Sequence, residues 1–99
     1  MGSGYVGILS AELLFPENGS LKGKRKELLS VKAQLQRRFG ASVAEVDHHD
    51  LWQRSLIVMS CAAREVGELH GLLDGAERWL HGQEWVVARI ERRIVSLED

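Results

Sequence analysis

The sequence predicts an α+β fold in which two helices cover one face of a four-stranded antiparallel sheet. Four segments have the alternating or continuous apolar pattern of strands, and two segments repeat their apolar residues at helical spacing. Along the chain these segments follow the order βαββαβ. Because the crossovers are expected to be right-handed, both helices should lie on the same face. The expected architecture is therefore a ferredoxin-like sandwich.

The first half of the chain predicts a strand, a loop and a helix. Residues 5–15 alternate as a strand does, and residues 16–19 ("PENG") are typical of a loop. Ser20 is the expected N-cap of a helix that ends at Gly40, a residue type favoured just after a helix. The face of the strand expected to be buried carries Tyr5, Leu9, Ala11, Leu13 and Phe15. The apolar seam of the helix comprises Leu21, Leu28, Val31, Leu35 and Phe39.

The second half predicts two further strands, a helix and a last strand. Residues 42–48 alternate, and residues 49–53 form a turn. Residues 54–62 are apolar on both faces, which indicates a central, covered strand. A second helix begins near Arg64, and residues 85–95 form the last strand. The expected buried face of that last strand carries Val86, Ala88, Ile90 and Ile94, and its open face carries Val87, Arg89, Glu91 and Arg93.

The composition is that of one folded domain covering residues 1–99. Hydrophobic residues make up 44% and charged residues 27%, which is ordinary for a globular protein. No apolar run approaches the ~20 residues that span a bilayer, and the N-terminus lacks the basic start of a secretory signal. We therefore expect a cytoplasmic chain with no membrane partner. Cys61 lies in an apolar run, which favours a small core side chain over a nucleophile.

Positive charge is concentrated in the first predicted helix. The segment 22–38 has a formal charge of +6, whereas the rest of the chain has −7, for a net charge of −1. Such asymmetry suggests an anionic partner. The candidate phosphate contacts are Lys22, Lys24, Arg25 and Lys26, with Lys32 and Arg37 as further contacts. The alternative is a solvated helix face whose lysine stems shield apolar surface.

The stretch Asp47-His48-His49-Asp50 raises the question of a metal site. Imidazole and carboxylate groups are suitable ligands for zinc, iron or manganese. Consecutive residues on a strand point to opposite faces, however, and His70 and His81 lie far away on the second helix. A specific zinc site needs three or four convergent ligands. The favoured interpretation is a hairpin turn held by side-chain hydrogen bonds, with no metal and no other cofactor.

Three further features are weaker candidates. Glu45 and Asp47 would share one strand face with Glu12, but solvated carboxylates paired with Arg89 or Arg93 are favoured over an acid–base pair. Recognition of RNA on the sheet face, as in an RRM domain, would need aromatic residues on the central strands, and residues 54–62 have none. Three glycines recur every fourth residue on the second helix, where a close partner contact or simple tolerance would explain them: Gly67, Gly71 and Gly75.

Two motifs closely resemble the YlxP-like family, a bacterial family of unknown function. The first is "SLKGKRK", residues 20–26, and the second is "VAEVDHHDLWQR", residues 43–54. The chain departs from the family pattern at Gly23, where the family has Glu, and at His49, where Gln is usual. The first departure removes the capping-box partner of Ser20. The second makes a metal role for His49 doubtful.

The resemblance implies a ferredoxin-like fold and an RNA or ribosome context, since genes of the family often lie beside those of transcription and translation factors. It implies no catalytic residue. In the second motif we expect Trp52 to anchor the turn against the core or a partner. The residues expected to hold the turn are Glu45, Asp47, His48, Asp50, Gln53 and Arg54.

Three functions follow in order of preference. The leading hypothesis is a non-enzymatic module that binds RNA or a ribonucleoprotein through phosphate contacts of the basic helix. The second is a homo-oligomeric protein-interaction module that uses the open sheet face or the glycine-bearing helix. The third is a metal-dependent enzyme that uses Asp47, His48, His49 and Asp50.

Overall fold

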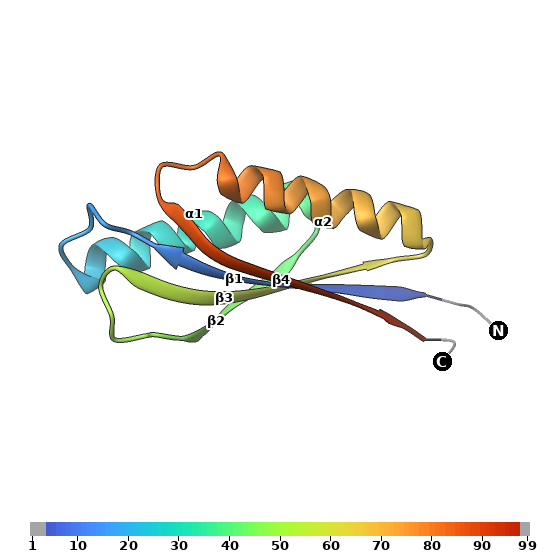
Figure 1. Ribbon diagram of the computed structural model, residues 1–99, viewed down its shortest axis with the longest axis horizontal. Helices are drawn as coiled ribbons and strands as arrows, with labels where there is room; N and C mark the ends of the chain where they lie inside the picture. Colours follow the sequence, from blue (N-terminus) through green and yellow to red (C-terminus); the bar gives the residue numbers. More distant parts are fainter. Residues whose placement is uncertain (1–3, 98–99) are drawn as a thin grey trace.

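The computed structural model describes residues 4–97, and the five remaining residues of the expected domain 1–99 lie outside this range. The elements, in chain order, are β1 (Tyr5–Leu14), α1 (Leu21–Phe39), β2 (Ser42–Asp47), β3 (Arg54–Ala63), α2 (Val66–His81) and β4 (Val86–Ser96). The strands pair antiparallel in the order β2-β3-β1-β4. Both helices lie on the same face of this sheet (Figure 1). The predicted ferredoxin-like sandwich is confirmed.

The ends of α1 follow the expected capping chemistry. Ser20 is extended, and its hydroxyl accepts a hydrogen bond from the backbone N–H of Gly23 at 3.0 Å. Gly40 has a φ of 63°, a left-handed conformation that glycine adopts without strain, and its N–H donates to the carbonyl of Gln36. The helix is therefore fixed at its start, which is the end that borders the candidate site.

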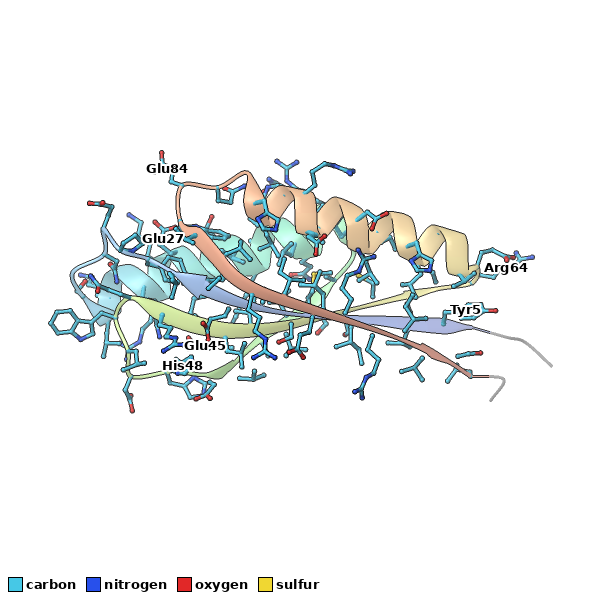
Figure 2. All side chains as sticks on the ribbon, viewed as in Figure 1. Tyr5, Glu27, Glu45, His48, Arg64 and Glu84 are labelled. Carbon is cyan, nitrogen blue, oxygen red and sulfur yellow. The ribbon has the colours of Figure 1, made fainter. Side chains whose placement is uncertain are left out.

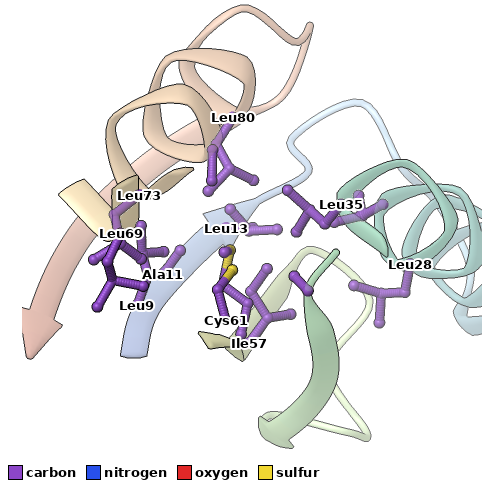
Figure 3. Packing of buried hydrophobic residues seen from close by; sticks show 14 of the residues in the cluster. Leu9, Ala11, Leu13, Leu28, Leu35, Ile57, Cys61, Leu69, Leu73 and Leu80 are labelled. Atoms are coloured by element: carbon purple, nitrogen blue, oxygen red, sulfur yellow. The ribbon is translucent and has the colours of Figure 1, made fainter. Parts of the chain in front are cut away.

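The core lies between the helices and the covered face of the sheet. Leu9, Ala11 and Leu13 of β1 are fully buried, with Leu9 and Ala11 next to α2, while α1 packs on the β2 side of the sheet and directs Leu28 and Leu35 into the core (Figure 3). Gly7 allows this close packing, because a Cβ there would lie 2.9 Å from Leu69 Cδ1. The cysteine is part of the same cluster, as expected: Cys61 is buried, and burial raises the pKa of its thiol.

An extra residue in β4 changes which side chains face the core. Leu13 pairs with Val87 and Glu12 pairs with Arg89, so Ala88 is the extra residue of a β-bulge. Val87 consequently packs against the core, whereas Val86 is exposed. The predicted alternation is correct for Ile90 and Ile94 but wrong before the bulge, because one inserted residue reverses the faces.

A second bulge separates two carboxylates of β2. Glu45 pairs with Ile57 on the covered face of β3, whereas Asp47 pairs with Leu56 on the open face, so Val46 is the extra residue. The prediction that Glu45 and Asp47 share a face is therefore wrong. Glu45 lies under α1, and Asp47 lies on the side that no helix covers.

The glycines of α2 do not form one stripe. Gly67 and Gly71 face open space, whereas a Cβ on Gly75 would lie 2.8 Å from Phe39 Cε1 of α1. Gly75 is thus a contact point between the two helices and does not belong to an outward-facing row. Within residues 4–97, neither helix combines the length and apolar character needed to cross a membrane.

Candidate functional site at the β2–β3 loop

The residues of the second sequence motif surround the β2–β3 loop, defined as residues 48–53. This loop and the beginning of α1 lie at the same end of the molecule (Figure 1). Glu45 and His48 lie toward this end of the sheet, whereas Tyr5 and Arg64 mark the opposite end (Figure 2). The two motifs, about twenty residues apart in sequence, therefore form one region in space.

Lys24 joins the two motifs directly. Its side chain is 1% exposed, and its ammonium group lies 2.6 Å from the carbonyl of His48 and 3.1 Å from that of Arg54. A third carbonyl, that of His49, lies at 3.3 Å. The Oε2 atom of Glu45 completes the set at 3.0 Å. Because an ammonium group has three N–H donors, all of them are used inside the protein. This corrects the expectation for Lys24, which holds the loop and has no donor left for a phosphate.

Glu45 is the anionic partner of this buried cation. Its carboxylate accepts a 2.6 Å hydrogen bond from the hydroxyl of Ser55 and a 3.0 Å hydrogen bond from Nδ1 of His49. Burial by itself raises the pKa of Glu45. The hydrogen bonds from Ser55, His49 and Lys24, together with the charge of Lys24, outweigh burial and bring the pKa below its ordinary value. Glu45 is thus held as a carboxylate with its oxygens occupied.

A second group of charged side chains borders the loop on the open face of the sheet. Arg54 donates to both oxygens of Glu12 at 3.1 Å, and Nε2 of His48 lies 3.8 Å from the same carboxylate. The carboxylate of Asp47 accepts from the backbone N–H of His48 at 2.7 Å. This bond fixes the one described non-glycine residue with a left-handed backbone, His48 at φ 65°. The chain can therefore turn sharply as it leaves β2.

Asn18 ties the loop before α1 to the β2–β3 loop. Its amide nitrogen donates to the carbonyl of Trp52 at 2.6 Å and to that of Ser20 at 2.7 Å. In the other direction, Nε2 of Gln53 donates to the carbonyls of Pro16 and Asn18 at 3.1 and 3.0 Å. These bonds place Trp52 immediately beside the N-cap of α1.

Two large apolar side chains remain exposed on this fixed loop, and we call Leu51 and Trp52 the loop tip. Trp52 is 54% exposed and Leu51 is 46% exposed. The other two tryptophans pack inside: Trp85 contacts Phe15 and Trp79 edge to face. Trp52 is therefore not anchored in the core, and contact of Trp52 with a partner remains a prediction. An open hollow of about 440 Å³ runs along the tip, lined by Asp50, Leu51, Trp52, Gln53 and Arg54.

The other basic residues of the first motif point outward. Lys22, Arg25 and Lys26 are exposed, and they lie at positions i, i+3 and i+4, which share one side of a helix. The half-buried Lys32 continues this side, and we call these four residues the basic face of α1. Among residues 4–97, none of the ion pairs includes a member of the basic face, and the same holds for Arg37. Arg37 instead donates to the side chain of Gln34.

The four residues Asp47-His48-His49-Asp50 diverge. The ring of His48 faces Glu12 on the open face, whereas the ring of His49 faces Glu45 on the covered side. Asp47 binds the backbone, and Asp50 is exposed at the turn. Within the described part of the chain, no group of three or more His, Cys, Asp or Glu side chains gathers as a metal site requires.

Sequence reasoning missed two residues of this site. The sequence places Asn18 in a loop and predicts no role for Ser55. Asn18 precedes an N-cap by two positions, and Ser55 follows the second motif directly, so neither has a local pattern that points to its partner. Their roles depend on contacts with residues ten to 34 positions away.

These observations define a small ferredoxin-like protein with a clamped β2–β3 loop beside a basic helix face. The chain belongs to the family described as "Protein of unknown function (DUF503)", whose profile matches residues 6–93. The chain is also similar to "Uncharacterized protein YlxP" of Bacillus subtilis (strain 168), with 34% identity over 50 residues. That match spans 50% of this chain and about half of the relative, 54% of its length.

Among solved structures, the chain is similar to the de novo designed protein Foldit4, with a TM-score of 0.50 and 11% identity. The match covers 93% of this chain and 96% of the designed one. Protein SO0527 from Shewanella oneidensis has a TM-score of 0.46 and 16% identity, over 93% of this chain and 95% of the other. At these identities the likeness to Foldit4 shows the fold alone.

Proposed function

We propose that this protein is a non-enzymatic cytoplasmic module that binds RNA, or the RNA of a ribonucleoprotein such as the ribosome, through the basic face of α1. The observation that carries the proposal is an exposed helix side with Lys22, Arg25 and Lys26, none of which forms an ion pair with a carboxylate of residues 4–97. Like charges this close repel one another, which costs a few tenths of a kcal/mol per pair on a helix. Phosphate oxygens would relieve that repulsion and release counterions.

The burial of Lys24 supports this separation of roles. If every basic residue of the first motif were exposed to solvent, the motif would indicate only the charged first turn of a surface helix. Instead one lysine holds the loop, and its neighbours in sequence are turned outward. Phosphate contact is therefore assigned to Lys22, Arg25 and Lys26, with Lys32 and Arg37 farther along the helix. Lys24 contributes only by fixing the helix against the loop.

A charge-reversal pair tests this function. Lys22→Glu/Arg25→Glu should weaken RNA binding and flatten the slope of log affinity against log salt by about 0.7 per lost contact on single strands. The matched control is Arg64→Glu/Arg78→Glu, which changes the net charge by the same amount. Both residues are exposed; Arg64 lies just before α2 and Arg78 lies within it. Anisotropy with ribosomal RNA fragments from low to physiological salt provides the readout. Failure of the parent protein to bind RNA at low salt, or equal losses in the two pairs, would overturn the proposal.

A second candidate is self-association through the open sheet face. Its apolar side chains are half-buried with no helix above them: Val6, Ile8, Leu14, Leu56 and Val58. Charged residues of β4 border them, as at the rim of an interface: Arg89, Glu91 and Arg93. Strands of these lengths, spaced about 4.8 Å apart, present an open face on the order of 600 Å². That approaches the ~800 Å² per partner of a standard interface.

Val58→Lys tests this alternative, because the substitution places a charge at the centre of the face and removes little from the monomer core. A dimer should then become an 11.1 kDa monomer in multi-angle light scattering. Val66→Lys changes an exposed valine of α2 and is the control. A parent protein that is monomeric at all concentrations would exclude the candidate.

A further inference from the structure

The loop tip has a feature that phosphate contact does not explain. Trp52 exposes 54% of its surface to water, although the loop that carries it is fixed from several sides. An exposed indole on a mobile loop would be unremarkable, since loops lie at the surface. Here the backbone carbonyl of Trp52 accepts from Asn18 at 2.6 Å, and the next residue, Gln53, donates to two carbonyls.

Lys24 fixes the loop from the other side. Its ammonium group binds the carbonyls of His48, His49 and Arg54, which lie before and after the tip. Both ends of the loop are thus held, while the side chains of Leu51 and Trp52 stay outside. A rigid aromatic group presented to solvent loses little conformational entropy when a ligand stacks on it.

The surroundings of Trp52 indicate the class of ligand. The amide of Asn18 bridges the carbonyl of Trp52 and that of Ser20, the N-cap of α1. The basic face begins two residues later, at Lys22. An exposed indole at the end of the molecule where α1 and its basic face begin fits a ligand that alternates flat aromatic groups with anions, which is the pattern of a nucleic acid strand.

We propose that Trp52 stacks an unpaired base, so that this protein takes a single-stranded segment of RNA with its phosphates on the basic face of α1. The inference rests on the proposed RNA-binding function and specifies its substrate. Paired bases inside a duplex cannot reach an indole at the surface of a loop, whereas splayed bases of a loop or strand can. The hollow along the tip, with Asp50 and Arg54 at its wall, leaves space for the base.

The test compares one RNA in two forms. A labelled RNA about twelve nucleotides long, within known single-strand site sizes, is titrated as a single strand and as a blunt duplex. Trp52→Ala should weaken single-strand binding about five- to a hundred-fold, the range observed when one stacking ring is removed. Duplex binding should stay unchanged. Trp52→Phe keeps a ring and should restore most of the single-strand affinity.

Lys22→Glu/Arg25→Glu separates this inference from the proposed function, because it should weaken both RNA forms. If that pair loses binding while Trp52→Ala binds single strands like the parent, the stacking inference is wrong and the basic face stands. If the parent binds neither form, both proposals fail. If Trp52→Ala abolishes capture of a protein partner but leaves single-strand affinity intact, the tip is a protein contact and the inference is likewise overturned.

A direct fluorescence readout tests whether the indole of Trp52 itself contacts the RNA. In a Trp79→Phe/Trp85→Phe background, Trp52 is the remaining tryptophan. Stacking should quench its fluorescence on addition of the single strand and leave it unchanged on addition of the duplex. Equal quenching by the two forms would contradict the inference. Because Trp79 and Trp85 pack against the core, circular dichroism must first show that this background is folded.

Discussion

At the scale of single residues, the main result concerns Lys24. Sequence reasoning grouped it with its basic neighbours, but its side chain is almost completely buried and holds three carbonyls and a carboxylate. A buried charge is tolerated only when it is paired and hydrogen-bonded. Lys24 meets both conditions, and so does its partner Glu45 through Ser55 and His49.

Lys24→Met keeps the length of the stem and removes the ammonium group. We expect the free energy of unfolding to fall by about 2–4 kcal/mol, because Glu45 loses its counter-charge and the loop carbonyls lose their donor. Urea denaturation measures the change. Lys26→Met is the matched control and should stay within about 0.5 kcal/mol of the parent, since Lys26 is exposed. Equal stability of the two variants would contradict the role given to Lys24.

Glu45 makes a second prediction at this scale, on pH. The pKa of Glu45 is lowered in the folded state from the ordinary value of 4.5. A carboxyl group with a depressed folded pKa stabilises the protein above its unfolded pKa, and that contribution is lost as pH falls through the folded pKa. Denaturation between about pH 6 and pH 3 should therefore show a steeper loss for the parent than for Glu45→Gln.

The control for this experiment is Glu17→Gln, which removes one exposed carboxylate that does not contact Lys24 or Glu45. Its stability should fall with pH as steeply as that of the parent. Parallel curves for the parent and Glu45→Gln would mean that the Lys24–Glu45 pair contributes nothing to acid sensitivity.

At the scale of elements, the start of α1 shows why glycine fits at position 23. A Cβ at this position would overlap Oδ1 of Asn18, whose amide nitrogen holds Ser20 and Trp52. The space that a larger residue at 23 would need is thus occupied by the side chain that ties the two loops together. The position of the Asn18 side chain therefore depends on the absence of a side chain at Gly23.

A double-mutant cycle tests this coupling. Alanine is favoured over glycine inside a helix by about 1 kcal/mol, so Gly23→Ala should stabilise the protein by about that amount in an Asn18→Ala background. In the parent the same substitution should be neutral or destabilising, because Asn18 must move and its hydrogen bonds weaken. The interaction free energy from four denaturation curves is the measurement. Additive effects would show that Asn18 adjusts freely.

Two glycines of α2 give opposite expectations. Gly71→Ala should stabilise the protein by about 0.5–1 kcal/mol, because its Cβ would lie in open space. Gly75→Ala should destabilise it by about 1–3 kcal/mol, because its Cβ would meet Phe39. Thermal denaturation of the two variants checks the signs. A stabilising Gly75→Ala would mean that α1 and α2 are less closely packed than the structure shows.

Sequence patterns predicted the elements well but failed where one residue is inserted. Ser20 and Gly40 mark the ends of α1 through local chemistry, so both could be identified from sequence. Val46 and Ala88 carry no local sign of a bulge, yet each reverses the faces of its strand. The burial of Lys24 was equally invisible, since its partners lie 21 to 30 positions along the chain. A basic residue in a basic run gives no sign of such a contact.

At the scale of the whole molecule, both helices and the sheet share one core cluster. A chain of this size with one core should unfold in a single step. We expect tryptophan fluorescence and far-ultraviolet circular dichroism to give the same midpoint in urea. The comparison is informative because Trp52 reports on the loop, while Trp79 and Trp85 report on the core. Separate midpoints would show that the β2–β3 loop opens before the core.

The two bulges have a consequence for how copies of this protein behave at high concentration. β2 and β4 are the edge strands, and a regular edge strand offers a row of unpaired amide and carbonyl groups that can template a strand from another molecule. Each edge carries one extra residue, Val46 or Ala88, which bends it and interrupts that row. We therefore expect both edges of the sheet to resist the strand-by-strand growth that leads to amyloid.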